Sequence, residues 1–116
     1  MKQSNLKKII EFRHELHKHP NLSNEERPTL ERIIRFLEEN TKNIEIVDKG
    51  HYVYAIYRAK DPKRPNIGFR SDCDAIKVYD DIDKPYKSVV DGVGHKCGHD
   101  GHTAVMAGFA MEIDQE

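Results

Sequence analysis

The sequence has few cysteines, no long apolar run and no excess of either charge. Its two cysteines, Cys73 and Cys97, are too few for a disulfide framework; in a reducing compartment such residues are more often ligands, nucleophiles or core residues. No stretch approaches the roughly 20 apolar residues of a membrane span, and the basic N-terminus lacks the apolar core of a signal peptide. We therefore expect a cytoplasmic protein with no membrane partner.

The balance of charges also excludes a class of partner. Lys and Arg number 19 against 20 Asp and Glu, and the signs alternate along the chain. No basic stripe of the kind that attracts nucleic acid is present, so we expect no nucleic-acid partner. With 116 residues, 37% of them hydrophobic, the chain has room for one modest folded core.

Apolar residues at helical spacing predict two helices in the first third of the chain. The first runs from about Asn5 to Lys18, and the second from near Ser23 to Asn40. Ser23 and Glu26 have the spacing of a capping box, although Pro28 leaves open where the second helix begins. The predicted buried stripes are Leu6, Ile9, Ile10 and Leu16, then Leu30, Ile33, Ile34 and Leu37.

The pattern then changes to the alternation of strands. Residues 44–46 and 53–57 predict a hairpin, and residues 67–74 predict a further short strand. An acidic, irregular segment over 77–91 and a glycine-punctuated loop lead into a third helix. Its apolar positions are Ala104, Ala107, Gly108 and Met111. This order of elements indicates a layered α/β or α+β domain.

The loop before the third helix is dense in side chains that bind transition metals. These are His95, Cys97, His99, Asp100 and His102. Thiolate and imidazole suit zinc, cobalt, nickel, manganese or copper, and Cys97 and His99 can converge on one ion. The helix N-terminus and Lys96 favour a thiolate at Cys97. Two alternatives remain open: the histidines cap the helix while Cys97 fills the core, or Cys97 is a nucleophile paired with a histidine.

A second group of polar residues lies at the end of the strand predicted over 67–74. Alternation places Arg70, Asp72 and Asp74 on one face, where carboxylates could bind a metal or orient a metal-bound histidine. The alternative is an acidic strand end solvated at the surface. Cys73 faces away from these acids and is expected in the core. For His14, His17 and His19 on the first helix we favour a structural role over binding.

Three motifs in order resemble one enzyme family: FRHELHKHPNLSNEE, FRSDCDAI and GVGHKCGHDGHTA. They resemble the amidohydrolase branch of the aminoacylase family of metallopeptidases, which includes hippurate hydrolases, N-acyl-amino-acid amidohydrolases and auxin-conjugate hydrolases. The resemblance implies an α/β fold, the N-terminal part of a zinc-peptidase-like catalytic domain with helices packed on a short mixed sheet. It also implies that residues 1–116 are a truncated catalytic domain without the dimerisation domain.

The resemblance further implies a site. Cys97 and His99 take the positions of two metal ligands, and Asp72 and Asp74 take supporting positions. Asp100 and His102 fall within the motif without an assigned contact to the ion. The implied cofactor is zinc or manganese, with cobalt or nickel as alternatives. The general base, a glutamate of a Glu-Glu pair, and the remaining ligands belong to later segments of such enzymes.

Departures from the family pattern are Ser71 in place of Ala, Ile76 and Lys77 in place of Leu-Pro, and Gly94 in place of Met. We expect a metal-dependent amidohydrolase that releases an amino acid from a small N-acyl amino acid, with a site that this chain leaves incomplete. The alternative is an inactive fragment that acts as a metal-binding or interaction module. Exposed sheet edges would favour self-association.

Overall fold

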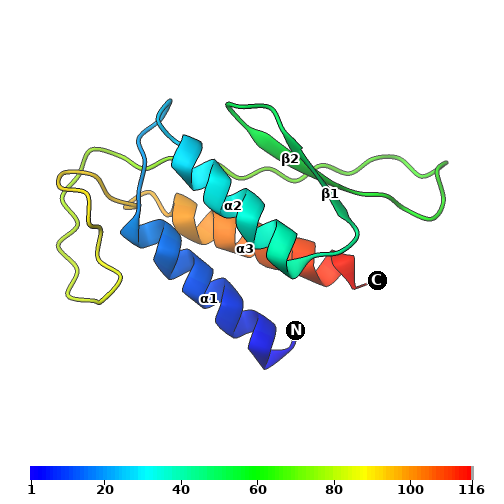
Figure 1. Cartoon of the computed structure of the whole chain (residues 1–116), viewed down its shortest axis with the longest axis horizontal. Coiled ribbons are helices and arrows are strands. Elements are labelled where there is room, and N and C mark those ends of the chain that lie inside the picture. Colours follow the sequence, from blue (N-terminus) through cyan, green and yellow to red (C-terminus); the bar gives the residue numbers. More distant parts are fainter. Residues whose placement is uncertain (116) are drawn as a thin grey trace.

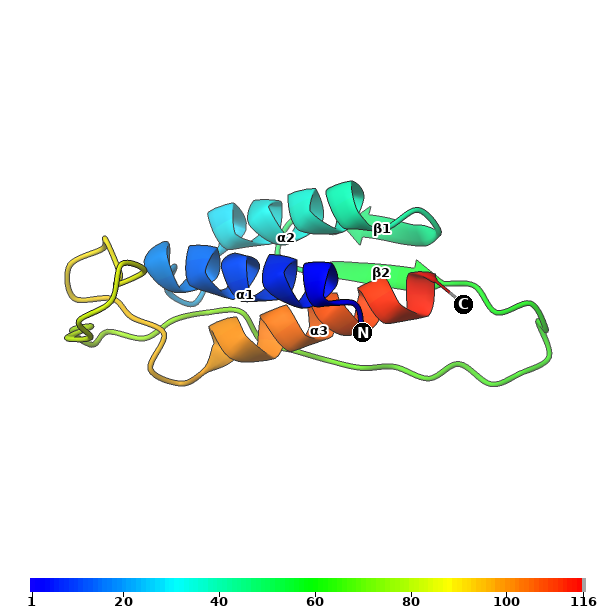
Figure 2. The same cartoon turned by 90° about the horizontal axis from the view of Figure 1, so that it is seen from below.

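The computed structural model describes residues 1–115 as three helices and one β-hairpin. The elements are α1 (Gln3–Lys18), α2 (Arg27–Asn40), β1 (Ile44–Asp48), β2 (Val53–Tyr57) and α3 (His99–Asp114). The helices lie side by side, and α1 runs opposite to α2 and α3 (Figures 1 and 2). The three predicted helices and the predicted hairpin are thus confirmed.

The core lies between the three helices. It contains Ile9, Phe12 and Leu16 of α1, with the Phe12 and Phe36 rings stacked at 4.2 Å between centroids. The buried face of α1 differs from the predicted stripe, because Leu6 and Ile10 are exposed. From α3 the core takes all four predicted positions, Ala104, Ala107, Gly108 and Met111.

α1 and α3 approach closely at Gly108. A Cβ built on this glycine would lie 2.7 Å from the Ile9 Cδ1 atom, well inside van der Waals contact. The absence of a side chain therefore allows the two helices to pack at this distance. The contact holds α3, which begins with the predicted metal loop, against α1.

The predicted capping box at the start of α2 is wrong. α2 begins at Arg27, with Pro28 in its first turn, and no side chain of its N-cap residue closes the helix. The Glu26 carboxylate instead accepts the Asn24 backbone N–H at 3.0 Å. The Thr29 N–H is bound by Asn21 Oδ1 at 3.0 Å, so the start of the helix is capped from outside.

The further strand predicted over 67–74 is not formed. In residues 1–115 the sheet has two strands, β1 and β2, paired antiparallel, and the parallel component is an isolated bridge between Leu22 and Ala75. A strand requires a neighbour to take its backbone hydrogen bonds, and no backbone–backbone bond joins 67–74 to another described segment. The segment is extended, and Ile67 and Phe69 are exposed.

The long irregular segment 77–98 gathers where α1 ends and α3 begins (Figures 1 and 2). It is held there by the Val89 N–H bond to the Lys18 carbonyl and by a two-bond bridge between Ile76 and Gly94. The predicted metal loop thus lies at the end of the helical layer away from the chain ends. None of the helices in residues 1–115 is long and apolar enough to cross a membrane.

Candidate metal centre

The His99 imidazole is oriented by Asp74. Its Nδ1 lies 2.9 Å from both the carboxylate Oδ1 and the backbone carbonyl of Asp74. Both partners are acceptors, so Nδ1 carries the proton and Nε2 presents a lone pair. A carboxylate on one ring nitrogen and a free second nitrogen is the arrangement of metal-binding histidines. Asp74, one of the acids expected to bind a metal or to orient a histidine, thus contacts the His99 ring.

Cys97 lies just before α3, separated from His99 by Gly98. The Cys97 thiol is exposed and unpaired with another cysteine. Gly98 is the N-cap of α3 and has φ +84°, a left-handed conformation that side chains disfavour. The glycine thus allows the chain to turn sharply between the two candidate ligands.

The donors in this loop suit a transition metal, and they make part of a site. A thiol and an imidazole whose Nδ1 is already occupied are chemically suited to zinc. Within the described residues no group of three or more His, Cys, Asp or Glu side chains is placed to hold an ion. Cys97 and His99 therefore fit a metal as two ligands of a set that needs further donors.

Asp100 points away from solvent and into the helical layer. Its side chain is 1% exposed, and Oδ2 lies 2.8 Å from His17 Nδ1 and 2.9 Å from Arg13 Nε. The structure thus brings Asp100 to α1 and not to the exposed face of the loop. This contact with α1 could not be recognised in the sequence, because Asp100 lies in a loop dense in possible metal ligands.

A second buried acid faces the same histidine. Asp80 Oδ2 lies 2.9 Å from His17 Nε2 and accepts the Ser88 N–H at 2.8 Å, while Lys96 Nζ lies 3.1 Å from Asp80 Oδ1. Burial acts to raise the Asp80 pKa, but these hydrogen bonds outweigh it and hold the pKa well below its usual range. Lys96 Nζ contacts acidic side chains, so the predicted stabilisation of a Cys97 thiolate by Lys96 is not observed.

His95 is buried beside this network. Neither ring nitrogen has a hydrogen-bond partner among the described residues, and Asp100 Oδ1 is likewise buried without one. Burial lowers the His95 pKa, although the nearby Asp100 carboxylate acts to raise it.

Asp72 and His102 lie at the exposed side of the loop. The Asp72 carboxylate accepts Arg70 Nη2 at 2.7 Å, and its carbonyl accepts the Thr103 hydroxyl. His102 is exposed, with its ring centroid 6.2 Å from that of His99. Both residues line a hollow with Phe69, Val105, Met106 and Phe109. Cys73 is half-buried, and burial, followed by nearby carboxylates, raises its pKa to about 11.

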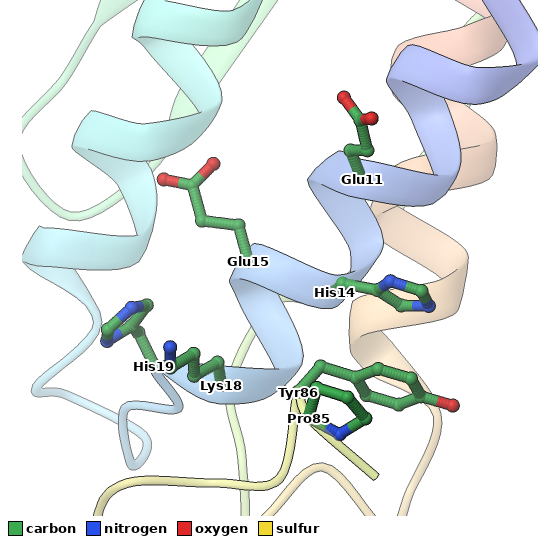
Figure 3. Close-up of a pocket in the computed structure, with 7 residues that line it drawn as sticks. All are labelled: Glu11, His14, Glu15, Lys18, His19, Pro85 and Tyr86. Atoms are coloured by element: carbon green, nitrogen blue, oxygen red, sulfur yellow. The ribbon is translucent and has the colours of Figure 1, made fainter.

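A further hollow lies against α1 and contains neither Cys97 nor His99 in its lining. It is lined by residues of α1 and by Pro85 and Tyr86, which the segment 77–91 places against the helix (Figure 3). The His14 and Tyr86 rings stack at 3.8 Å, and Tyr86 also meets His17 edge-on. This packing fixes the segment that carries Asp80.

Sequence reasoning expected a structural role for His17 but did not identify its partners, and it missed Asp80. His17 lies 63 residues from Asp80 and 83 residues from Asp100 in the chain, so no local spacing could have revealed these contacts. The one available signal was the motif FRHELHKHP, in which Arg13 and His17 are four residues apart and therefore share a helix face.

Comparison with known proteins supplies the context of this loop. No protein-family model matches the chain. It is 40% identical over 112 residues to an N-acetylcysteine deacetylase of Bacillus subtilis (strain 168), covering 93% of this chain and 28% of the relative. An N-acetyl-L-cysteine deacetylase of the same organism is 36% identical over 109 residues, covering 94% and 26%.

A solved structure agrees with these relatives. A dinuclear metal-binding peptidase of the M20 family from Bacillus subtilis superposes with a TM-score of 0.91 at 37% identity, covering 99% of this chain and 32% of that one. The chain therefore spans between about a quarter and a third of the length of the proteins that it matches. The α/β fold inferred from the sequence is confirmed.

Proposed function

Because the chain is homologous to the N-terminal part of amidohydrolases related to the M20 peptidases, we propose that it supplies two metal ligands to an amidohydrolase site. The ligands are Cys97 and His99. The substrate is a small N-acyl amino acid, and the products are an amino acid and a carboxylic acid. Residues 1–116 belong to one catalytic domain, and the dimerisation domain lies outside them.

One observation carries this proposal. The Asp74 carboxylate and carbonyl lie 2.9 Å from His99 Nδ1, which leaves Nε2 as the donor atom. The Cys97 thiol lies two residues earlier across a left-handed glycine, and a reducing cytoplasm would keep it available as a ligand.

The residues of this chain have distinct tasks in the proposed site. Asp74 fixes the tautomer and rotation of His99, and Cys97 supplies negative charge as a thiolate. A bound divalent ion, zinc or manganese with cobalt or nickel as substitutes, polarises the amide carbonyl and lowers the pKa of water. The general base and the remaining ligands come from segments outside these 116 residues. Asp72 and His102 line the adjacent hollow, where a substrate could contact them.

A chimeric enzyme tests the proposal. Residues of this chain replace the aligned region of the Bacillus subtilis N-acetylcysteine deacetylase, which is 40% identical. We expect the chimera to hydrolyse N-acetylcysteine, and Cys97→Ala or His99→Asn to reduce kcat/KM by at least about 100-fold. His51→Asn is the matched control, because His51 is an exposed residue between β1 and β2.

The isolated chain provides the complementary measurement. We expect no turnover of N-acetyl or N-benzoyl amino acids by the 116-residue protein, because it lacks a general base. Turnover by that protein would contradict the division of the site between segments. A chimera that folds and binds metal but does not hydrolyse its substrate would favour the inactive metal-binding module instead.

A further inference from the structure

The residues that flank the two candidate ligands are both anchored to buried acids or bases. Lys96 precedes Cys97, and its Nζ lies 3.1 Å from Asp80 Oδ1. Asp100 follows His99, and its Oδ2 lies 2.8 Å from His17 Nδ1. The loop between these two anchors is short and contains both ligands. Its position therefore depends on where the anchors are held.

A single side chain joins the two anchors. His17 Nδ1 faces Asp100, and His17 Nε2 lies 2.9 Å from Asp80 Oδ2. The His17 side chain is 4% exposed and both carboxylates are 1% exposed. Because the imidazole is rigid, it fixes the separation of Asp80 and Asp100. Through them it fixes the separation of Lys96 and the first turn of α3.

The surroundings of His17 hold the ring in one orientation. Tyr86 meets it edge-on at 5.6 Å between centroids, and Phe12 and Leu16 belong to the core on the same helix. Both His17 ring nitrogens have a carboxylate partner, and a misplaced ring would leave a buried carboxylate oxygen without its partner. A ring placed in this way is suited to transmit position from α1 to the loop.

We propose that His17 is a positioning residue that braces both sides of the loop carrying Cys97 and His99. This inference rests on the proposed function, since it concerns the alignment of the same two ligands. His17 does not itself contact the ion. Its link to Asp80 positions the Cys97 side, and its link to Asp100 positions the His99 side.

Two substitutions separate the two links. In His17→Asn the amide nitrogen replaces Nδ1, so the bond to Asp100 is retained and the bond to Asp80 is lost. In His17→Gln the amide nitrogen replaces Nε2, so the bond to Asp80 is retained and the bond to Asp100 is lost. His51→Asn, at an exposed position between β1 and β2, is the control.

The readouts are NMR signals of the two ligands without metal, and the dissociation constant for Zn²⁺. We expect His17→Gln to shift the His99 ring signals and leave those of Cys97, and His17→Asn to do the reverse. In the chimeric enzyme, both variants should bind Zn²⁺ about tenfold more weakly than the unsubstituted chimera, whereas His51→Asn should bind it equally well. A His17 that only fills the core would move both sets of signals alike, and that result would overturn the proposal.

A second pair of variants covers the case in which the His17 variants do not fold. Asp80→Asn removes the buried carboxylate, and Asp83→Asn makes the same charge change on an exposed side chain of the same segment. We expect Asp80→Asn to shift the Cys97 signals and weaken Zn²⁺ binding several-fold, with little effect of Asp83→Asn. Equal effects of the two would refute the brace.

The two proposals fail in different ways. A folded chimera that binds no Zn²⁺ contradicts the proposed function, while the metal-free NMR signals still test the brace. A chimera that binds Zn²⁺ with an affinity unaffected by His17→Gln and His17→Asn retains the proposed function and removes the brace.

Discussion

The close approach of α1 and α3 at Gly108 gives a prediction whose size can be worked out. Gly108→Ala places a Cβ 2.7 Å from Ile9 Cδ1, against about 3.5 to 4.0 Å for an optimal carbon contact. Overpacking of this kind costs about 1–3 kcal/mol, and the helix propensity of alanine returns about 1 kcal/mol. We therefore expect Gly108→Ala to destabilise the protein by about 1 kcal/mol.

A double-mutant cycle separates these two effects. Ile9→Val removes Cδ1 and costs about 0.5–1.5 kcal/mol by itself, and the next Ile9 atom, Cγ1, is 3.4 Å away. In that background Gly108→Ala should stabilise the protein by up to about 1 kcal/mol. The coupling energy is then about 1–3 kcal/mol, measured by urea unfolding of the four proteins. Additivity within about 0.5 kcal/mol would refute the close packing of the helices.

Three further predictions concern charge, backbone and surface. Arg27 holds the Asp48 pKa at about 2, so the stabilisation by this carboxylate is complete above about pH 4 and is lost as the pH falls toward 2. The difference in unfolding free energy between wild type and Asp48→Asn should therefore shrink over that range. A difference that stays constant with pH would argue against this ion pair. Gly98→Ala should lower the free energy of unfolding in urea by about 1–2 kcal/mol, because φ at this position is +84°. Gly101→Ala, inside α3, should raise it by about 1 kcal/mol. Equal effects of the two substitutions would contradict the left-handed turn at Gly98. In sedimentation velocity the chain should self-associate through the exposed segment 67–74, and the Phe69→Ser variant should self-associate less. A wild-type protein that stays monomeric at every concentration would be inconsistent with this.

The helices could be predicted because their signals are local. Leu30 and Leu37 of α2, and Ala104 and Met111 of α3, recur at helical spacing, and the structure buries all four. The stripe on α1 was predicted less well, since Ile10 is exposed. Burial on a helix is decided by which neighbours pack against it, and the sequence does not state where α3 lies.

The strand predicted over 67–74 shows the opposite case. Its alternation is real, but a strand forms when another segment takes its hydrogen bonds, and periodicity contains no information about that partner. The site shows the same division. The loop with Cys97 and His99 could be found from ligand density alone, whereas the contacts of His17 with Asp80 and Asp100 depend on the fold.

A Co²⁺ titration of the chimeric enzyme, followed by absorbance, tests the two proposed ligands most directly. We predict a thiolate-to-cobalt band that disappears in Cys97→Ala, weakens in His99→Asn and remains in Cys73→Ala, because Cys73 is half-buried with a pKa raised to about 11. The absence of any band in the unsubstituted chimera, or an equal band in Cys97→Ala, would contradict the assignment of Cys97 and His99 as metal ligands.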